Sequence, residues 1–203
     1  MKWTRQFPDG RPGYTTNDGD TDLIFSDLIQ SPAAKERLRS NPTIKEQADA
    51  LKQKAAGRLI EIVNAEDGTT RAQVVVEVPL TYEGVGGFNR VGDLLYLSTG
   101  DNRTIVYSLK TGVQLRQLFG TIVTADSSSQ IICSANRRDE TVVSDKSGRE
   151  LLHLTLGSPL RFAALQNHGT QLLVLTADQR IRRFTIPTKV SQDDTHGIAS
   201  NVQ

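Results

Sequence analysis

Short apolar runs recur along the chain, and turns with glycine or acidic residues separate them. Three segments share one pattern, an extended run, a turn ending in glycine and a second extended run: residues 58–78, 103–119 and 140–156. Asp-Gly, Thr-Gly and Ser-Gly close the three turns, at Gly68, Gly112 and Gly148. Glycine adopts the positive φ of tight hairpin turns without steric cost. The pattern therefore predicts three β-hairpins.

A further apolar strand precedes each hairpin. Its copies cover residues 92–102, 128–139 and 169–180, and a fainter copy covers 19–27. The runs 94–97 and 172–175 are apolar at every position, which is typical of a strand covered on both faces. The turn glycines lie 44 and 36 residues apart (68 to 112 and 112 to 148). A repeat of that length with about four strands is typical of a β-propeller blade.

The segment 31–57 has a different character. Ser31-Pro32 and Asn41-Pro42 each place a capping side chain before a proline at the first helical position. An apolar stripe at helical spacing follows, formed by Ile44, Ala48, Leu51 and Ala55. Gly57 is the expected left-handed stop. We expect a pair of helices inserted in the first blade, with the stripe packed on the sheet and the charged side available to a partner.

Two segments, residues 98–108 and 175–185, resemble the end of a WD40 repeat. In that family a Ser or Thr precedes a turn with an Asp, and the following strand ends in an aromatic and a polar residue. The turn acids here are Asp101 and Asp178, and Tyr107 and Phe184 stand where the family prefers Trp. The Gly-His and Trp-Asp dipeptides of the family do not occur in the sequence. The resemblance is to a degenerate WD40-like β-propeller of bacterial type.

The repeats and the resemblance together predict a mainly β fold: a partial or small β-propeller of four-stranded antiparallel blades. We expect the propeller segment over residues 1–188, with blades near 13–78, 79–119, 120–157 and 158–188 and with the helical insertion at 31–57. Residues 189–203 are polar and lack an apolar period, so we expect a disordered tail.

About four blades are fewer than WD40-like rings usually have, and an unclosed stack leaves sheet edges unpaired. Three explanations stay open. The chain is the C-terminal portion of a longer propeller or a gene fragment, it is a true four-bladed ring, or two copies complete one ring. The open blade edges make self-association a further expectation.

Charge and hydropathy narrow the classes of partner. The 24 basic and 23 acidic residues give a formal net charge of +1. A nucleic-acid surface usually shows a basic excess or stripe, so we expect no nucleic acid partner. No apolar run approaches the length of about 18 residues that a membrane span needs, and the first residues lack the apolar stretch of a signal peptide. We expect no membrane partner and a cytoplasmic protein, or an exported one if a signal precedes the sequence.

Residues suited to catalysis or metal binding do not form a recognisable pattern. Cys133 is the single cysteine and lies in an apolar run, so we expect a small buried side chain. His153 alternates with leucines, His168 lies in a turn and His196 lies in the tail, which gives no Ser-His-Asp arrangement. The basic clusters at 137–140 and 180–184 are expected to be solvated edges. We therefore expect neither catalysis nor a cofactor or metal.

The leading hypothesis for function is a non-catalytic WD40-like propeller segment that serves as a scaffold for an unidentified protein partner. Stacked blades form a rigid body whose loops vary freely, and such loops carry binding sites. The alternative is the C-terminal portion of a propeller enzyme of the quinone-dependent dehydrogenase or lactonase type, or of a sensory protein, whose active region lies upstream. The residues we single out are structural repeat positions only: Gly68, Gly112, Gly148, Asp101, Asp178, Tyr107 and Phe184.

Overall fold

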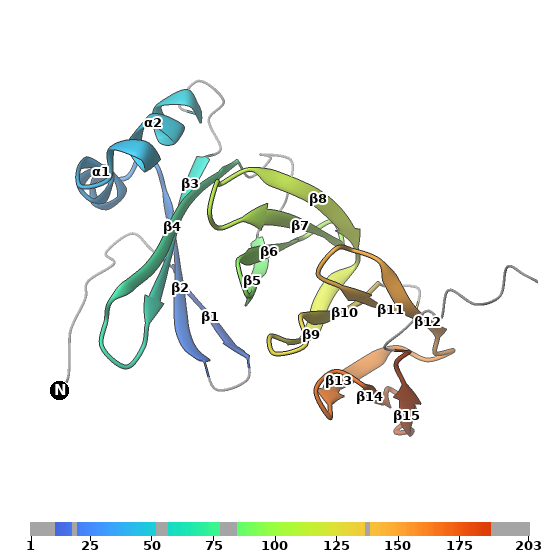
Figure 1. The fold of residues 1–203 in the computed structure, drawn as a ribbon. Helices are drawn as coiled ribbons and strands as arrows, with labels where there is room; N and C mark the ends of the chain where they lie inside the picture. The colour runs from blue at the N-terminus through green and yellow to red at the C-terminus, as the bar shows by residue number, and fades with distance from the viewer. Residues whose placement is uncertain (1–10, 18–19, 52–56, 78–84, 137–138, 188–203) are drawn as a thin grey trace, which may run out of the picture.

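The computed structural model describes residues 11–17, 20–51, 57–77, 85–136 and 139–187. In these residues fifteen strands form four antiparallel sheets (Figure 1). The first sheet holds β1 (Arg11–Asn17), β2 (Asp20–Leu28), β3 (Gly57–Asn64) and β4 (Thr70–Glu77). The second holds β5 (Val85–Val91), β6 (Leu94–Thr99), β7 (Arg103–Ser108) and β8 (Gln114–Phe119).

The third sheet holds β9 (Thr121–Asp126), β10 (Ile131–Ala135), β11 (Glu140–Asp145) and β12 (Glu150–Thr155). The fourth holds β13 (Leu160–Gln166), β14 (Gln171–Thr176) and β15 (Ile181–Thr185), so three strands are described where we expected four. In every sheet each strand pairs with the next along the chain. The predicted hairpins are β3–β4, β7–β8 and β11–β12, and the predicted mainly β fold class is confirmed.

The sheets follow one another in chain order, with the first and the last at opposite ends of the row (Figure 1). The first strands β1, β5, β9 and β13 make contact in sequence, so they line one side of the stack. Apolar side chains fill the space between neighbouring sheets. Ile60 packs with Leu95 between the first two sheets, and Cys133 packs with Leu172 between the last two. This is how the blades of a propeller bury their faces.

Burial of the second strand depends on whether a sheet lies on each side. In β6 the residues from Leu95 to Thr99 are all buried, and β10 is buried throughout. In β14 buried and half-buried residues alternate. Our expectation that the run 172–175 is covered on both faces is therefore wrong for Leu173 and Leu175. In the described part of the chain only the third sheet packs on β14, so the opposite face stays partly open.

The two helices of the insertion are α1 (Pro32–Arg39) and α2 (Pro42–Leu51). Ser31 caps α1, with its side chain accepting a hydrogen bond from the Ala34 N–H at 3.1 Å. Ile44 and Ala48 of the predicted stripe are buried against Leu59 and Val75, on the face of the first sheet that turns away from the second sheet. The helices therefore cover the outer face of the first sheet.

The prediction for Gly57 is wrong, because this residue begins β3 and does not adopt a positive φ. A Cβ added to it would lie 2.5 Å from Cδ1 of Ile29, so a larger residue here would have to displace the Ile29 side chain. Ala55 and the tail at 189–203 lie outside the described residues.

Candidate functional site

One turn geometry recurs between the second and third strands of the sheets. In the second sheet the Thr99 hydroxyl lies 2.5 Å from a carboxylate oxygen of Asp101 and 2.9 Å from the Arg103 carbonyl oxygen. In the fourth sheet the Thr176 hydroxyl lies 2.5 Å from the Asp178 carboxylate and 3.2 Å from the Arg180 carbonyl. Each Asp also pairs with the Arg that closes its turn. The residue before that Arg has a positive φ in both turns.

The charge state of these turn acids follows from the same hydrogen bonds. The hydrogen bond from the Thr176 hydroxyl lowers the pKa of Asp178 below its ordinary value, with a further contribution from the Arg180 charge. Burial would raise the pKa of Asp101, but hydrogen bonds from Arg103 and Thr99 outweigh it and lower that pKa. Both carboxylates therefore stay ionised and hold the turns closed.

The equivalent turn of the third sheet uses different side chains. The Asn136 amide donates to the Glu140 carboxylate at 2.7 Å and accepts from the Glu140 N–H at 3.1 Å. In the first sheet the same connection, between β2 and β3, contains both helices. The link between second and third strands therefore shares one turn geometry in the second and fourth sheets and differs from it in the first and third, and such variable loops often carry binding sites.

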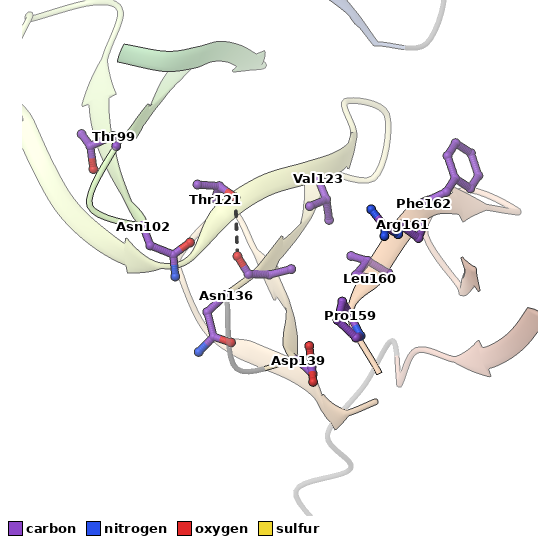
Figure 2. Close-up of a pocket in the computed structure, with 12 residues that line it drawn as sticks. Thr99, Asn102, Thr121, Val123, Asn136, Asp139, Pro159, Leu160, Arg161 and Phe162 are labelled. Carbon is purple, nitrogen blue, oxygen red and sulfur yellow. Dashed lines mark hydrogen bonds between the residues drawn. The ribbon is translucent and has the colours of Figure 1, made fainter. Parts of the chain in front are cut away.

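A cavity of about 600 Å³ opens beside these turns (Figure 2). Its walls come from the second, third and fourth sheets: Thr99, Gly100, Asn102, Thr121, Val123, Ala135, Asn136, Asp139, Pro159, Leu160, Arg161 and Phe162. The turns and the beginnings of β9 and β13 meet here because both lie at the same end of the sheets. Three neighbouring sheets thus contribute residues to the same cavity.

The cavity combines apolar surface with an unengaged cation. Phe162 is 55% exposed and Val123 is 39% exposed, so both offer apolar surface to a ligand. Arg161 lies between Leu160 and Phe162 on β13, is exposed, and forms no ion pair with another described residue (Figure 2). The amide side chain of Asn102 adds a donor and an acceptor at the opposite wall, where Asn136 is bonded to Glu140. Such a surface suits a ligand with apolar and acidic groups.

The wall of the cavity is held by backbone and side-chain hydrogen bonds. The buried Thr104 hydroxyl donates to the Gly120 carbonyl at 2.8 Å, which fixes the start of β9 against the second sheet. Thr121 Oγ1 lies 3.5 Å from the Ala135 carbonyl oxygen, the contact drawn in Figure 2. The beginning of β9 is therefore fixed to the second sheet by Thr104 and to β10 of its own sheet by Thr121.

The repeat positions named from the sequence lie outside this lining. Gly68, Gly112 and Gly148 have positive φ in the turns between third and fourth strands. Tyr107 is buried on β7 and its hydroxyl donates to the Glu77 carbonyl at 2.6 Å, whereas Phe184 packs in the core between the last two sheets. Asp101 and Asp178 lie in the turns described above, and Asp101 stands between two lining residues. None of these seven residues lines the cavity.

The sequence analysis missed β9 and β13, which supply much of the lining. The short connections before them could have indicated where they begin: the single residue Gly120 joins β8 to β9, and a short link joins β12 to β13. Such short links place the start of each first strand at the same sheet end as the turns between second and third strands.

The cysteine and histidines are placed as follows. Burial raises the pKa of the fully buried Cys133 thiol to about 12, so it is not a thiolate nucleophile at neutral pH. His153 lies on the outer strand β12, with Nδ1 3.3 Å from the Glu150 carboxylate, and His168 lies in the turn after β13.

Among the described residues no three His, Cys, Asp or Glu side chains gather as metal ligands. None of the described helices has the length and apolar content needed to span a bilayer.

Comparison with known proteins identifies the fold. No protein family and no curated protein sequence matches this chain. The crystal structure of BamB from Moraxella catarrhalis is 12% identical, with a TM-score of 0.50 over 90% of this chain and 45% of that one. Hsv2 from Kluyveromyces lactis is 11% identical, with a TM-score of 0.57 over 90% of this chain and 49% of that one.

The chain spans about half the length of these two solved structures. At such low identity the likeness concerns the fold alone. It agrees with the stack of antiparallel sheets described above, and the chain has the architecture of a partial or small β-propeller.

Proposed function

We propose that the chain is a non-catalytic, WD40-like propeller segment that binds another protein at the cavity between its second, third and fourth sheets. The observation that carries the proposal is the exposed pair of Phe162 and Arg161 on β13, at the rim of a hollow to which three sheets contribute. Aromatic residues and arginine are the side chains that most often dominate protein–protein binding energy.

The chemistry of the cavity indicates what kind of segment would bind. Phe162 and Val123 offer apolar contact to a side chain, and the guanidinium of Arg161 can donate two parallel hydrogen bonds to a carboxylate. The Asn102 amide can bond to peptide groups of a bound main chain. The fitting ligand is an extended peptide segment in which an apolar residue stands next to an acidic one.

The rigidity of the wall favours such binding. Because hydrogen bonds of Thr104 and Thr121 hold the beginning of β9 against the second sheet and against β10, little conformational entropy is lost there when a ligand binds. The turns at Thr99 and Asn136 are closed by their own hydrogen bonds in the same way. The cavity is therefore preorganised.

The proposal is tested with peptides selected from a random displayed library on the full-length chain. We expect the enriched peptides to share an apolar residue beside an acidic one. Because Arg161 would bind the carboxylate, Arg161→Glu should weaken the affinity by about tenfold or more. Phe162→Ala should weaken it comparably, and NMR shifts on peptide addition should map to the cavity.

A matched control is Phe119→Ala on the outer strand β8. Phe119 is 44% exposed, close to the 55% of Phe162, but it does not line the cavity. Its replacement should change affinity by less than about twofold. If selected peptides bind Arg161→Glu and Phe162→Ala as tightly as the unchanged chain, the cavity is not the binding site.

A further inference from the structure

The third strand of the fourth sheet, β15, lies at a sheet edge, whereas the third strands of the other sheets are each covered by an outer strand. β3, β7 and β11 each lie between a second strand and an outer strand, whereas β15 lies at the edge of its sheet among the described strands. Thr104 and Thr141, which follow the turns into β7 and β11, are fully buried. Ile181 has the same place in β15 and is 71% exposed. Among the described residues none occupies the outer-strand position of the fourth sheet.

The first three sheets show how the chain reaches that position. The last residue of each third strand donates its N–H to the carbonyl that precedes the outer strand: Asn64 to Thr69, Ser108 to Val113 and Asp145 to Arg149. The acceptor lies five residues on in the first two sheets and four in the third. Thr185 corresponds to Ser108, because the next residue bonds back to the preceding turn in both sheets.

The first two sheets also share the register beyond this turn. Tyr107 pairs with Gln114, a bulge follows, and Val106 then pairs with Arg116. Val63 pairs with Thr70 and Ile62 with Ala72, with the bulge at the same place. Transferred to β15, this register would start an outer strand at Ser191 and would set Asp193 opposite Arg183 and Asp194 opposite Arg182.

We propose that residues 191–196, which belong to the tail that we expected to be disordered, instead bind the free edge of β15 as its outer strand. Residues 188–203 lie outside the described part of the chain, so the argument rests on β15 and on charge complementarity. Arg182 and Arg183 face opposite sides of the sheet, and the two neighbouring aspartates supply one acidic partner on each side. Opposite charges directly across two strands stabilise their pairing.

Another segment of the chain fits the edge less well. Residues 2–7 also have the alternation of an extended strand, but they carry Lys2 and Arg5 and would place positive charge beside Arg182 and Arg183. Like charges on paired strands repel. When residues 191–196 occupy the edge, they also prevent it from pairing with β-strands of other molecules.

The test is a set of charge reversals in the full-length chain, read out by hydrogen exchange of the β15 amides. Arg183→Glu and Asp193→Lys should each speed this exchange by about tenfold, because each puts like charges opposite one another. The double variant should restore the exchange rate to within about twofold of the original. Arg183→Glu combined with Asp194→Lys should not restore it. Raising the salt concentration should speed exchange in the unchanged chain.

A control variant and a peptide-addition experiment complete the test. Arg161→Glu, a reversal on the opposite edge strand β13, should leave β15 exchange unchanged. In the variant Asp193→Lys/Asp194→Lys, a synthetic peptide of residues 189–198 should slow β15 exchange when added. Rescue of Asp193→Lys by Arg182→Glu in place of Arg183→Glu would overturn the register. Single reversals without effect on β15 exchange would overturn the proposal itself.

Discussion

At the scale of single residues, a threonine hydroxyl organises the turns that border the cavity. Thr176 is 1% exposed, and its hydroxyl is placed to bond either to the Asp178 carboxylate or to the Arg180 carbonyl. Within this turn Gln179 adopts a positive φ of 62°, which is an unfavourable backbone conformation for a residue with a side chain. The side-chain bonds offset the local strain of that conformation.

We expect Thr176→Val to raise the pKa of Asp178 toward 3.8, because the hydrogen bond that lowers it is removed. In the unchanged chain the lowered folded-state pKa contributes stability above pH 3.8, and this contribution is lost as the pH falls through the folded-state value. The variant should therefore be less stable at neutral pH and approach the unchanged chain in acid. A carbon-detected NMR titration of Asp178 measures the shift, with Asp145 as an internal control. A titration curve of Asp178 that does not move would contradict the role of the hydroxyl.

At the scale of elements, the helical insertion completes the first sheet. Arg37 of α1 contacts the Asp27 carboxylate, and its Nη1 lies 3.5 Å from Glu61. Asp27 and Glu61 are only 2% and 1% exposed, so their charges have little access to water. Around them Ile44, Ala48, Leu59 and Val75 form an apolar cluster. The helices therefore supply both apolar cover and a counter-charge.

Arg37→Ala should lower the free energy of unfolding by about 3–5 kcal/mol, because it leaves two buried carboxylates without this cation. Urea denaturation measures the loss. Arg39→Ala is the matched control, since Arg39 lies on the same helix, is 73% exposed and pairs with an equally exposed Glu36. The control should change stability by less than about 0.5 kcal/mol. If Arg37→Ala and Arg39→Ala lowered the free energy of unfolding by the same amount, the buried ion pair would not be needed for stability.

The hairpins could be predicted from the sequence because their signals are local. Gly68, Gly112 and Gly148 have the positive φ that the turn residues indicate, and the flanking runs alternate or are apolar as strands require. The two helices, each of which begins with a capping side chain followed by a proline, could be predicted for the same reason. Their start signals lie within a few residues of the structure that they determine.

Features that depend on distant neighbours could not be predicted in this way. The run at Leu172–Leu175 has the same character as that at Leu94–Leu97, and only the presence of a sheet on each side distinguishes their burial. Gly57 was expected to be the left-handed stop of a helix, whereas it begins β3 and lies close to the side chain of Ile29. The cavity joins residues from Thr99 to Phe162 and has no continuous sequence pattern.

At the scale of the whole molecule, the two ends of the stack differ. The first sheet has the second sheet on one face and the helices on the other. A buried ion cluster also ties it to the second sheet, since Asp22 on β2 contacts Arg90 on β5. The fourth sheet has one neighbouring sheet and exposes Phe162 and Ile181. Cover therefore decreases toward the end of the stack that contains β15.

This asymmetry predicts a gradient of local stability. In a stack of repeats, each unit is stabilised mainly by contacts with its immediate neighbours, so a terminal unit with one covered face opens first. Leu95 on β6 and Leu172 on β14 provide a matched comparison, because both are fully buried and both face the preceding sheet. Native-state hydrogen exchange should show the Leu172 amide exchanging at least about tenfold faster than the Leu95 amide. Equal rates would mean that the four sheets unfold as one cooperative unit and that the open face of the fourth sheet has no energetic consequence.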